Sequence, residues 1–229
     1  MPKPPFRADH VGSLLRPNQL SDARKEWQEG KLSKDDLIDL ENKHIIDAIK
    51  LQENIGLKAI TDGEFRRDYW HLDFISGFEG IKLNEETYGH AFSGGGTVAT
   101  FTIDGKVGNH SGDMRDHFSF LSANTGETAK FCIPGPGMTH LRSGRSAISM
   151  EAYPDLVHYW PDLIRAYSDE IKKLAELGCS YLQIDDVSFA YLCDKKFRGD
   201  IIARGDNPDE LLIQYARALS EAVADRPES

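Results

Sequence analysis

Two short stretches, Thr61-Asp62-Gly63-Glu64 and Gln183-Ile184-Asp185-Asp186, decide the fold class of this chain. Each places carboxylates at the end of an apolar run, and each run follows a long amphipathic segment. Acids at strand exits in repeated helix-then-strand units are typical of an α/β barrel, which carries its active site at the C-terminal ends of its strands. The alternative for any single acid is an Asx-type turn that satisfies nearby backbone amides. We therefore predict an α/β fold with a sheet-end active site.

The elements expected around these stretches follow from apolar periodicity and from helix-ending residues. We predict helices near residues 35–54, 154–177 and 208–224, and strands near residues 8–14, 58–61, 131–134 and 181–184. An eight-unit barrel typically needs about 250 residues. We therefore predict that residues 1–229 form a single N-terminal portion of a TIM-type barrel, incomplete in this chain unless another polypeptide supplies the remainder.

The pattern changes between residues 80 and 133. Gly94-Gly95-Gly96, Asp104-Gly105 and Gly108-Asn109 punctuate alternating segments such as Thr97–Thr102. Such turn residues between alternating runs indicate β-hairpins. We interpret residues 80–133 as a β-rich insertion that serves as a lid or a subunit contact.

The composition bounds the function classes. The formal net charge of -10 disfavours nucleic-acid binding, and the chain contains no apolar run long enough to span a membrane. The N-terminus lacks the apolar core of a signal peptide, and the three cysteines show no CxxC or HxC spacing. We expect a cytoplasmic protein that acts on a small molecule and has no sequence-local zinc site.

Several side chains could take part in a site. Glu64 follows Gly63 where a strand meets a loop, which favours a functional role over a turn acid. Only one of Asp185 and Asp186 can point inward, because successive strand side chains alternate. His10 and His71 could be ligands or acid-base groups, although histidines that are simply hydrogen-bonded within a fold are commoner. For Arg66-Arg67, exposed charges are a simpler interpretation than a carboxylate clamp.

Four ordered motifs together suggest a family. They are Ala8-Asp9-His10-Val11-Gly12-Ser13-Leu14-Leu15-Arg16-Pro17, Thr61-Asp62-Gly63-Glu64-Phe65-Arg66-Arg67, Ile133-Pro134-Gly135-Pro136 and Tyr181-Leu182-Gln183-Ile184-Asp185-Asp186. With this set the chain resembles the cobalamin-independent methionine synthases, specifically their short, single-barrel members, over nearly all its length.

The resemblance implies a methyltransferase that moves a methyl group from a folate to the thiol of homocysteine, with zinc activating the thiolate. By matching motif, Gly12 and Ser13 would hold the amino acid's carboxylate, and Glu64 its ammonium group. Asp185 would be the catalytic acid near the amino acid and the folate, which leaves Asp186 as a supporting or capping residue.

The chain also departs from the family pattern. The family's zinc ligands, a His-x-Cys pair, a Glu and a Cys, have no counterparts in residues 1–229, so zinc is expected only for the intact family fold. Arg142, or no clear equivalent, stands where longer members carry a Trp for stacking on the folate, which weakens the case for a methyl-folate donor.

Two alternatives stay open at this point. One is zinc-dependent alkyl transfer to another thiol, as in coenzyme M transferases, where Arg142 or Arg145 would meet an anionic group. The other is a noncatalytic partner or a truncated form. A homo-oligomer, or association with a missing C-terminal half, would cover exposed strand edges.

Overall fold

The computed structural model describes residues 4, 6–84 and 100–227. The chain divides into two compact units. Unit 1 comprises Met1–Arg67, Met114–Cys132 and Leu177–Gln183, and unit 2 comprises Asp68–Asp113, Ile133–Glu176 and Ile184–Ser229.

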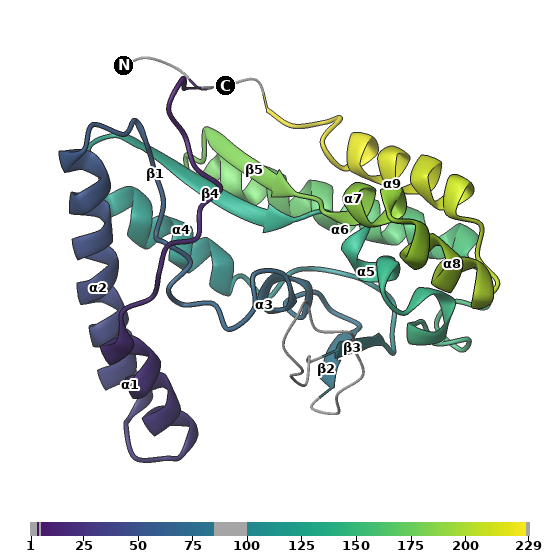
Figure 1. Ribbon diagram of the computed structural model, residues 1–229, viewed down its shortest axis with the longest axis horizontal. Coiled ribbons are helices and arrows are strands. Elements are labelled where there is room, and N and C mark those ends of the chain that lie inside the picture. The colour runs from purple at the N-terminus through teal and green to yellow at the C-terminus, as the bar shows by residue number, and fades with distance from the viewer. Residues whose placement is uncertain (1–3, 5, 85–99, 228–229) are drawn as a thin grey trace. The chain divides into compact units, whose positions relative to one another are not determined.

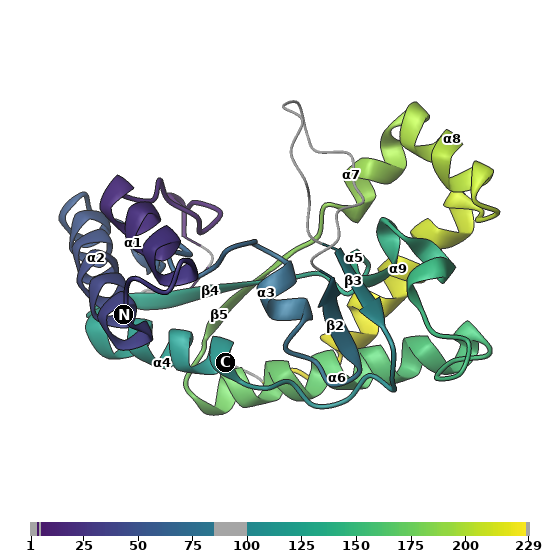
Figure 2. The ribbon, with the colours of Figure 1, turned by 90° about the horizontal axis from the view of Figure 1, so that it is seen from below.

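Two helices of unit 1, α1 (Asn18–Gln28) and α2 (Lys34–Asn54), run side by side (Figures 1 and 2). Helix α2 begins where the Ser33 hydroxyl accepts a hydrogen bond from the amide of Asp36 at 3.1 Å, which satisfies one of the free amides at the helix start. The apolar faces of both helices enter one core. Its buried members are Leu20, Ala23, Leu37, Ile45, Ala48, Ile49, Ile60, Phe65 and Leu121.

A three-stranded sheet stands beside these helices in the order β1-β4-β5. Strand β1 (Ala59–Ile60) pairs in parallel with β4 (Thr128–Pro134), with Ala59 opposite Thr128. Strand β5 is Tyr181–Asp185. The predicted strands near residues 58, 131 and 181 are therefore confirmed. The parallel pairing of β1 with β4 makes these two strands run in the same direction.

The N-terminal segment differs from its expectation. Residues 8–14 form no strand, and only an isolated parallel bridge joins Ser13 to Gly63. The physical reason is that the carbonyls of residues 10–12 accept hydrogen bonds from side chains instead of from a neighbouring strand.

The expected β-rich stretch is corrected in part. Unit 2 contains an antiparallel hairpin of β2 (Ile81–Asn84) and β3 (Thr100–Ile103), with Ile81 opposite Ile103. Residues 113–124, however, form helix α4 (Asp113–Asn124) because its apolar residues recur at helical spacing and are buried. The Gly94–Gly96 run and residues 97–99 lie outside the described residues.

Helices dominate the rest of unit 2. Helix α6 (Leu156–Glu176) contacts α9 (Pro208–Ala222), which begins at an Asn207 cap that accepts from the Asp209 amide at 3.0 Å. The shorter elements are α3 (Leu72–Ile75), α5 (Met138–Leu141), the 3-10 turn η1 (Gly144–Ala147), α7 (Ser188–Cys193) and α8 (Lys195–Ala203). The three long predicted helices, near 35–54, 154–177 and 208–224, are confirmed to within about two residues.

The fold class is α/β, and the described residues do not make up a complete barrel. Across those same residues, no helix combines the length and the apolar character needed to cross a membrane.

Candidate functional site

The backbone of Glu64 has a conformation that residues other than glycine rarely adopt. Both Gly63 and Glu64 have positive φ angles, 67° and 59°. For a residue with a Cβ atom this left-handed conformation is unfavourable, and such strain is concentrated at functional positions. The Asp62 carboxylate offsets it by accepting from the Glu64 amide at 2.9 Å, and the side chain of Glu64 is buried.

The Gly12-Ser13 segment lies directly against this turn in unit 1. The amide of Leu14 donates to the Gly63 carbonyl at 3.1 Å, and the Thr61 hydroxyl donates to the Gly12 carbonyl at 2.7 Å. A Cβ atom added to Gly12 would lie 3.3 Å from Glu64 Oε1. The structure therefore brings together three of the predicted site residues, Gly12, Ser13 and Glu64.

Arginine side chains surround the buried Glu64. Arg67 Nη1 lies 3.6 Å from Glu64 Oε1, and the Arg67 side chain also donates to the Cys132 carbonyl at 2.6 Å. Arg16 donates to the Glu64 carbonyl at 3.3 Å. A guanidinium at this distance compensates the cost of burying a carboxylate.

The expectation of exposed charges at Arg66-Arg67 is wrong. Arg67 is only 3% exposed, and its guanidinium lies over the Phe131 ring. Arg66 Nη2 donates to Asn42 at 2.7 Å, and Arg66 Nη1 lies 3.5 Å from the buried Glu41 carboxylate. The two arginines therefore belong to the interior of unit 1, where the carboxylates of Glu41 and Glu64 lie beside them.

Cys132, on β4, places its sulfur within 4.8 Å of a carboxylate oxygen of Glu64. A catalytic zinc site needs three protein ligands and a deprotonated thiol. Here the Cys132 thiol donates a hydrogen bond to the Val11 carbonyl at 2.9 Å, and Arg67 accompanies Glu64. The two groups supply two of the three protein ligands that such a site needs.

Asp185 and Asp186 belong to unit 2. Asp185 is the last residue of β5, and its carbonyl accepts from the Gly135 amide at 2.8 Å. The Asp186 carboxylate accepts from the amide and the hydroxyl of Ser188 at the start of α7. Burial raises the pKa of the Asp186 carboxyl above its ordinary value. Asp186 therefore binds the first residue of α7, and the supporting role of Asp186 and the catalytic role of Asp185 both stay predictions.

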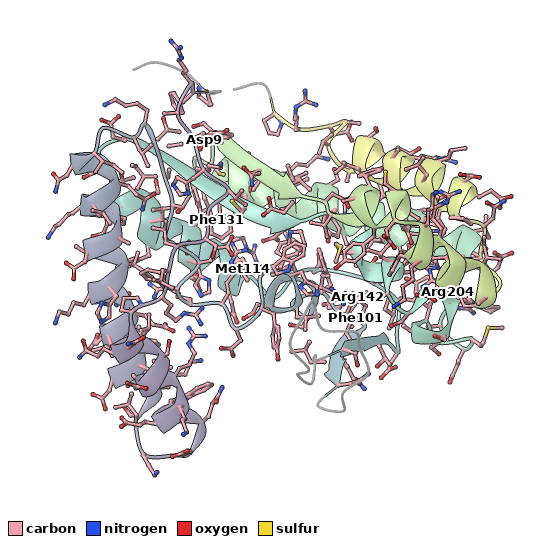
Figure 3. All side chains as sticks on the ribbon, in the orientation of Figure 1. Asp9, Phe101, Met114, Phe131, Arg142 and Arg204 are labelled. Atoms are coloured by element: carbon pink, nitrogen blue, oxygen red, sulfur yellow. The ribbon has the colours of Figure 1, made fainter. Side chains whose placement is uncertain are left out.

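His71 and Arg142 also lie in unit 2. Burial and, to a smaller extent, the positive charge of Arg142 together lower the pKa of His71 to about 4, so the imidazole is neutral at pH 7. Arg142 is exposed, lies over the Tyr191 ring, and has its carbonyl bound by Arg204 at 2.9 Å; both arginines are labelled in Figure 3. A neutral His71 can accept a proton only in acid solution.

His10 takes a structural position in unit 1. Its Nε2 lies 3.0 Å from Gln52 Oε1, and Gln52 in turn bonds the backbone of Thr61. This arrangement matches the interpretation of His10 as a histidine held by hydrogen bonds within the fold.

Two residues near Gly12 escaped the sequence reasoning, namely Cys132 and Lys130. They alternate along β4, so they point to the same face of the strand. Lys130 is 1% exposed, and its ammonium lies 3.0 Å from Asp9 Oδ1. Asp9 and Phe131, both labelled in Figure 3, belong to the two chain segments that meet here. A lysine in an otherwise apolar strand was the available signal, since a buried charge requires a partner.

Comparisons with known proteins give a consistent result. Residues 6–201 match the family model described as "Cobalamin-independent synthase, Catalytic domain". The chain is 38% identical over 228 residues to the uncharacterized protein YxjH of Bacillus subtilis (strain 168), covering 99% of this chain and 60% of that protein. It is 30% identical over 179 residues to the methionine synthase of Saccharolobus islandicus (strain L.S.2.15 / Lassen #1), covering 77% of this chain and 51% of the relative.

A solved structure extends the comparison to the fold. A Listeria monocytogenes protein, provisionally described as a vitamin-B12 independent methionine synthase, superposes with a TM-score of 0.81 at 33% identity. The superposition covers 99% of this chain and 64% of the Listeria chain. The chain thus spans about 60% of the length of YxjH and of the Bacillus subtilis relative YxjG.

Proposed function

The chain belongs to the cobalamin-independent synthase catalytic-domain family, and on that premise we propose that it serves methyl transfer to the thiol of homocysteine or a similar small thiol. The observation that carries the proposal is the juxtaposition in unit 1 of the Gly12-Ser13 turn with a buried, backbone-strained Glu64. A glycine, a hydroxyl and a carboxylate at one point suit the two charged groups of an amino acid.

In this proposal, Glu64 accepts hydrogen bonds from the substrate's ammonium group. The Ser13 hydroxyl and the backbone at Gly12 bind its carboxylate, which leaves the side-chain thiol free to react. Arg67 holds Glu64 in place and limits the cost of its burial. Gly12 has φ 144° and is buried, so the absence of a side chain there keeps room beside Glu64 Oε1.

The methyl donor and the metal are further parts of the proposal. Zinc, when bound to the thiol of the substrate, supplies a thiolate at neutral pH. Asp185 at the end of β5 is proposed as the acid that the family resemblance implies. A TIM-type barrel for the family fold is supported by parallel pairing of β1 with β4 and by the helix-strand succession α2-β1.

We also propose a cytoplasmic location. Cys132, Cys179 and Cys193 are all free thiols, which suits a reducing compartment.

Calorimetric titration tests the amino-acid site. L-homocysteine and N-acetyl-L-homocysteine differ at the amine, so only the former presents an ammonium group. We expect the wild-type protein to bind homocysteine at least about tenfold more tightly, because a charge-assisted hydrogen bond contributes roughly 1.5–3 kcal/mol. Glu64→Gln should abolish this preference, whereas Glu26→Gln, at an exposed position on α1, should preserve it.

Equal affinity of the wild-type protein for the two ligands would refute the role of Glu64. Absence of homocysteine binding would refute the proposed function. Because the preference is measured on the wild-type protein, the test does not depend on the folding of the Glu64 variant.

A further inference from the structure

The segment that carries Gly12 and Ser13 is attached to unit 1 in an unusual way. Three successive carbonyls, those of His10, Val11 and Gly12, each accept a hydrogen bond from a side chain. Backbone carbonyls in a strand normally bond the amides of a neighbouring strand. The position of this segment is therefore set by side-chain identity.

The donors come from the strands of the sheet. Lys130 and Cys132 of β4 donate to the carbonyls of His10 and Val11, respectively. Gln183 of β5 donates to the same Val11 carbonyl at 2.9 Å. Alternate residues of a strand share a face, so Lys130 and Cys132 lie on one side of β4.

The N-terminal end of the segment, at Asp9, is fixed by an ion pair. Lys130 Nζ lies 3.0 Å and 3.1 Å from the two carboxylate oxygens of Asp9, and the Tyr181 hydroxyl donates to the same carboxylate. Although burial alone would raise the pKa of Asp9, the hydrogen bonds from Tyr181 and Lys130 hold that pKa below its ordinary value. The aspartate is therefore ionised at neutral pH and keeps the buried ammonium paired.

The C-terminal end of the segment, at Gly12, lies against the strained turn of Gly63 and Glu64. The Thr61 hydroxyl donates to the Gly12 carbonyl and accepts from the Gly63 amide at 3.2 Å. Between these two fixed ends, Cys132 and Gln183 both donate to the Val11 carbonyl, one residue before Gly12.

We propose that Cys132 and Gln183 are positioning residues that hold the Val11 carbonyl and thereby keep Gly12 and Ser13 beside Glu64. Lys130 fixes the residues that precede Val11. The inference rests on the proposed function in one respect: Gly12, Ser13 and Glu64 bind the amino-acid part of the substrate. Neither Cys132 nor Gln183 needs to touch the ligand for this effect.

The test removes both donors while keeping side-chain size. We expect the double variant Cys132→Val/Gln183→Met to bind L-homocysteine about tenfold more weakly, since two hydrogen bonds of about 0.7 kcal/mol each amount to that factor. Amide hydrogen exchange at Leu14, which donates to the Gly63 carbonyl, should accelerate by about the same factor, and the urea midpoint should fall by no more than the two lost hydrogen bonds account for. The single variant Cys132→Ser, with Gln183 unchanged, keeps both donors. It should therefore show the homocysteine affinity and the Leu14 exchange rate of the wild-type protein.

The matched control is Cys193→Val, which alters an exposed thiol of unit 2 and should change neither reading. An unchanged exchange rate at Leu14 in the double variant would show that Cys132 and Gln183 do not hold this segment in place, whether or not homocysteine is the ligand. Faster exchange with unchanged homocysteine affinity would overturn the link to binding. If wild type fails to bind homocysteine, the proposed function fails, and Leu14 exchange still decides whether these side chains position the segment.

Discussion

Replacing Gly12 by alanine probes the closest contact in the candidate site. Gly12 has φ 144°, a conformation that costs a residue with a Cβ atom about 1–3 kcal/mol. The new Cβ would lie 2.7 Å from Cys132 Sγ and 3.3 Å from Glu64 Oε1, whereas ordinary contact begins at 3.4 Å. Overpacking of this kind costs roughly 1–3 kcal/mol. Gly12→Ala should therefore lower the free energy of unfolding by about 4 kcal/mol.

Gly56→Ala separates backbone strain from the steric clash. Gly56 also has a positive φ, 89°, but a Cβ atom there would meet nothing within 4 Å. This control should cost only about 1 kcal/mol, because it introduces the strain alone. Urea unfolding of both variants at pH 7.5 gives the difference, which measures the clash at Gly12.

A second substitution identifies the clashing atom. In a Cys132→Ala background the sulfur is absent, so Gly12→Ala should cost about 2 kcal/mol less than it does in the wild-type protein. Additive effects of the two substitutions, or equal stability of Gly12→Ala and Gly56→Ala, would show that Gly12 does not pack against Cys132 as described.

Three further expectations concern stability. Burial lowers the pKa of His71 and of His140 to about 4, so their contribution is complete above the unfolded pKa of 6.5 and declines as the pH falls toward 4. Urea unfolding should show a loss of about 2 kcal/mol per histidine between pH 7 and pH 5, and His140→Gln should flatten this dependence; an equally steep profile in that variant would contradict the assignment. Lys130→Met should destabilise the protein by about 2 kcal/mol, and Asp9→Asn should be less harmful in that background, because the two charges pair; a thermodynamic cycle without coupling would exclude the pair. Ser33→Ala should cost about 1 kcal/mol through loss of the α2 cap, and unaltered thermal unfolding would count against that cap.

Much of the secondary structure could be predicted from the sequence. Helix α2 follows from an apolar repeat between the Ser33 cap and Gly56, and α9 follows from Asn207 and Pro208 at its start. These signals are local, because the cap and the repeat lie in the same segment. Residues 8–14 show the limit of such reasoning: their apolar pattern suggests a strand, but their carbonyls find side-chain partners more than a hundred residues away.

For the candidate site, too, the sequence predicted some features, and others became known only from the tertiary structure. The motifs around Gly12, Glu64 and Asp185 were sufficient to predict the family, which the comparisons confirm. They could not predict that Arg67 would be buried against Glu64, or that Cys132 would reach the Val11 carbonyl. Those contacts join residues that no local pattern connects.

By itself, the sequence determined the family, the long helices and the strand ends on which the motif residues stand, because motifs, caps and apolar periods act over a few neighbouring residues. Only the tertiary structure decided which groups are buried, paired or strained. The left-handed backbone of Glu64 and the ion pair of Lys130 with Asp9 arise where distant segments meet, and the burial of charge has a cost only once the chain has folded.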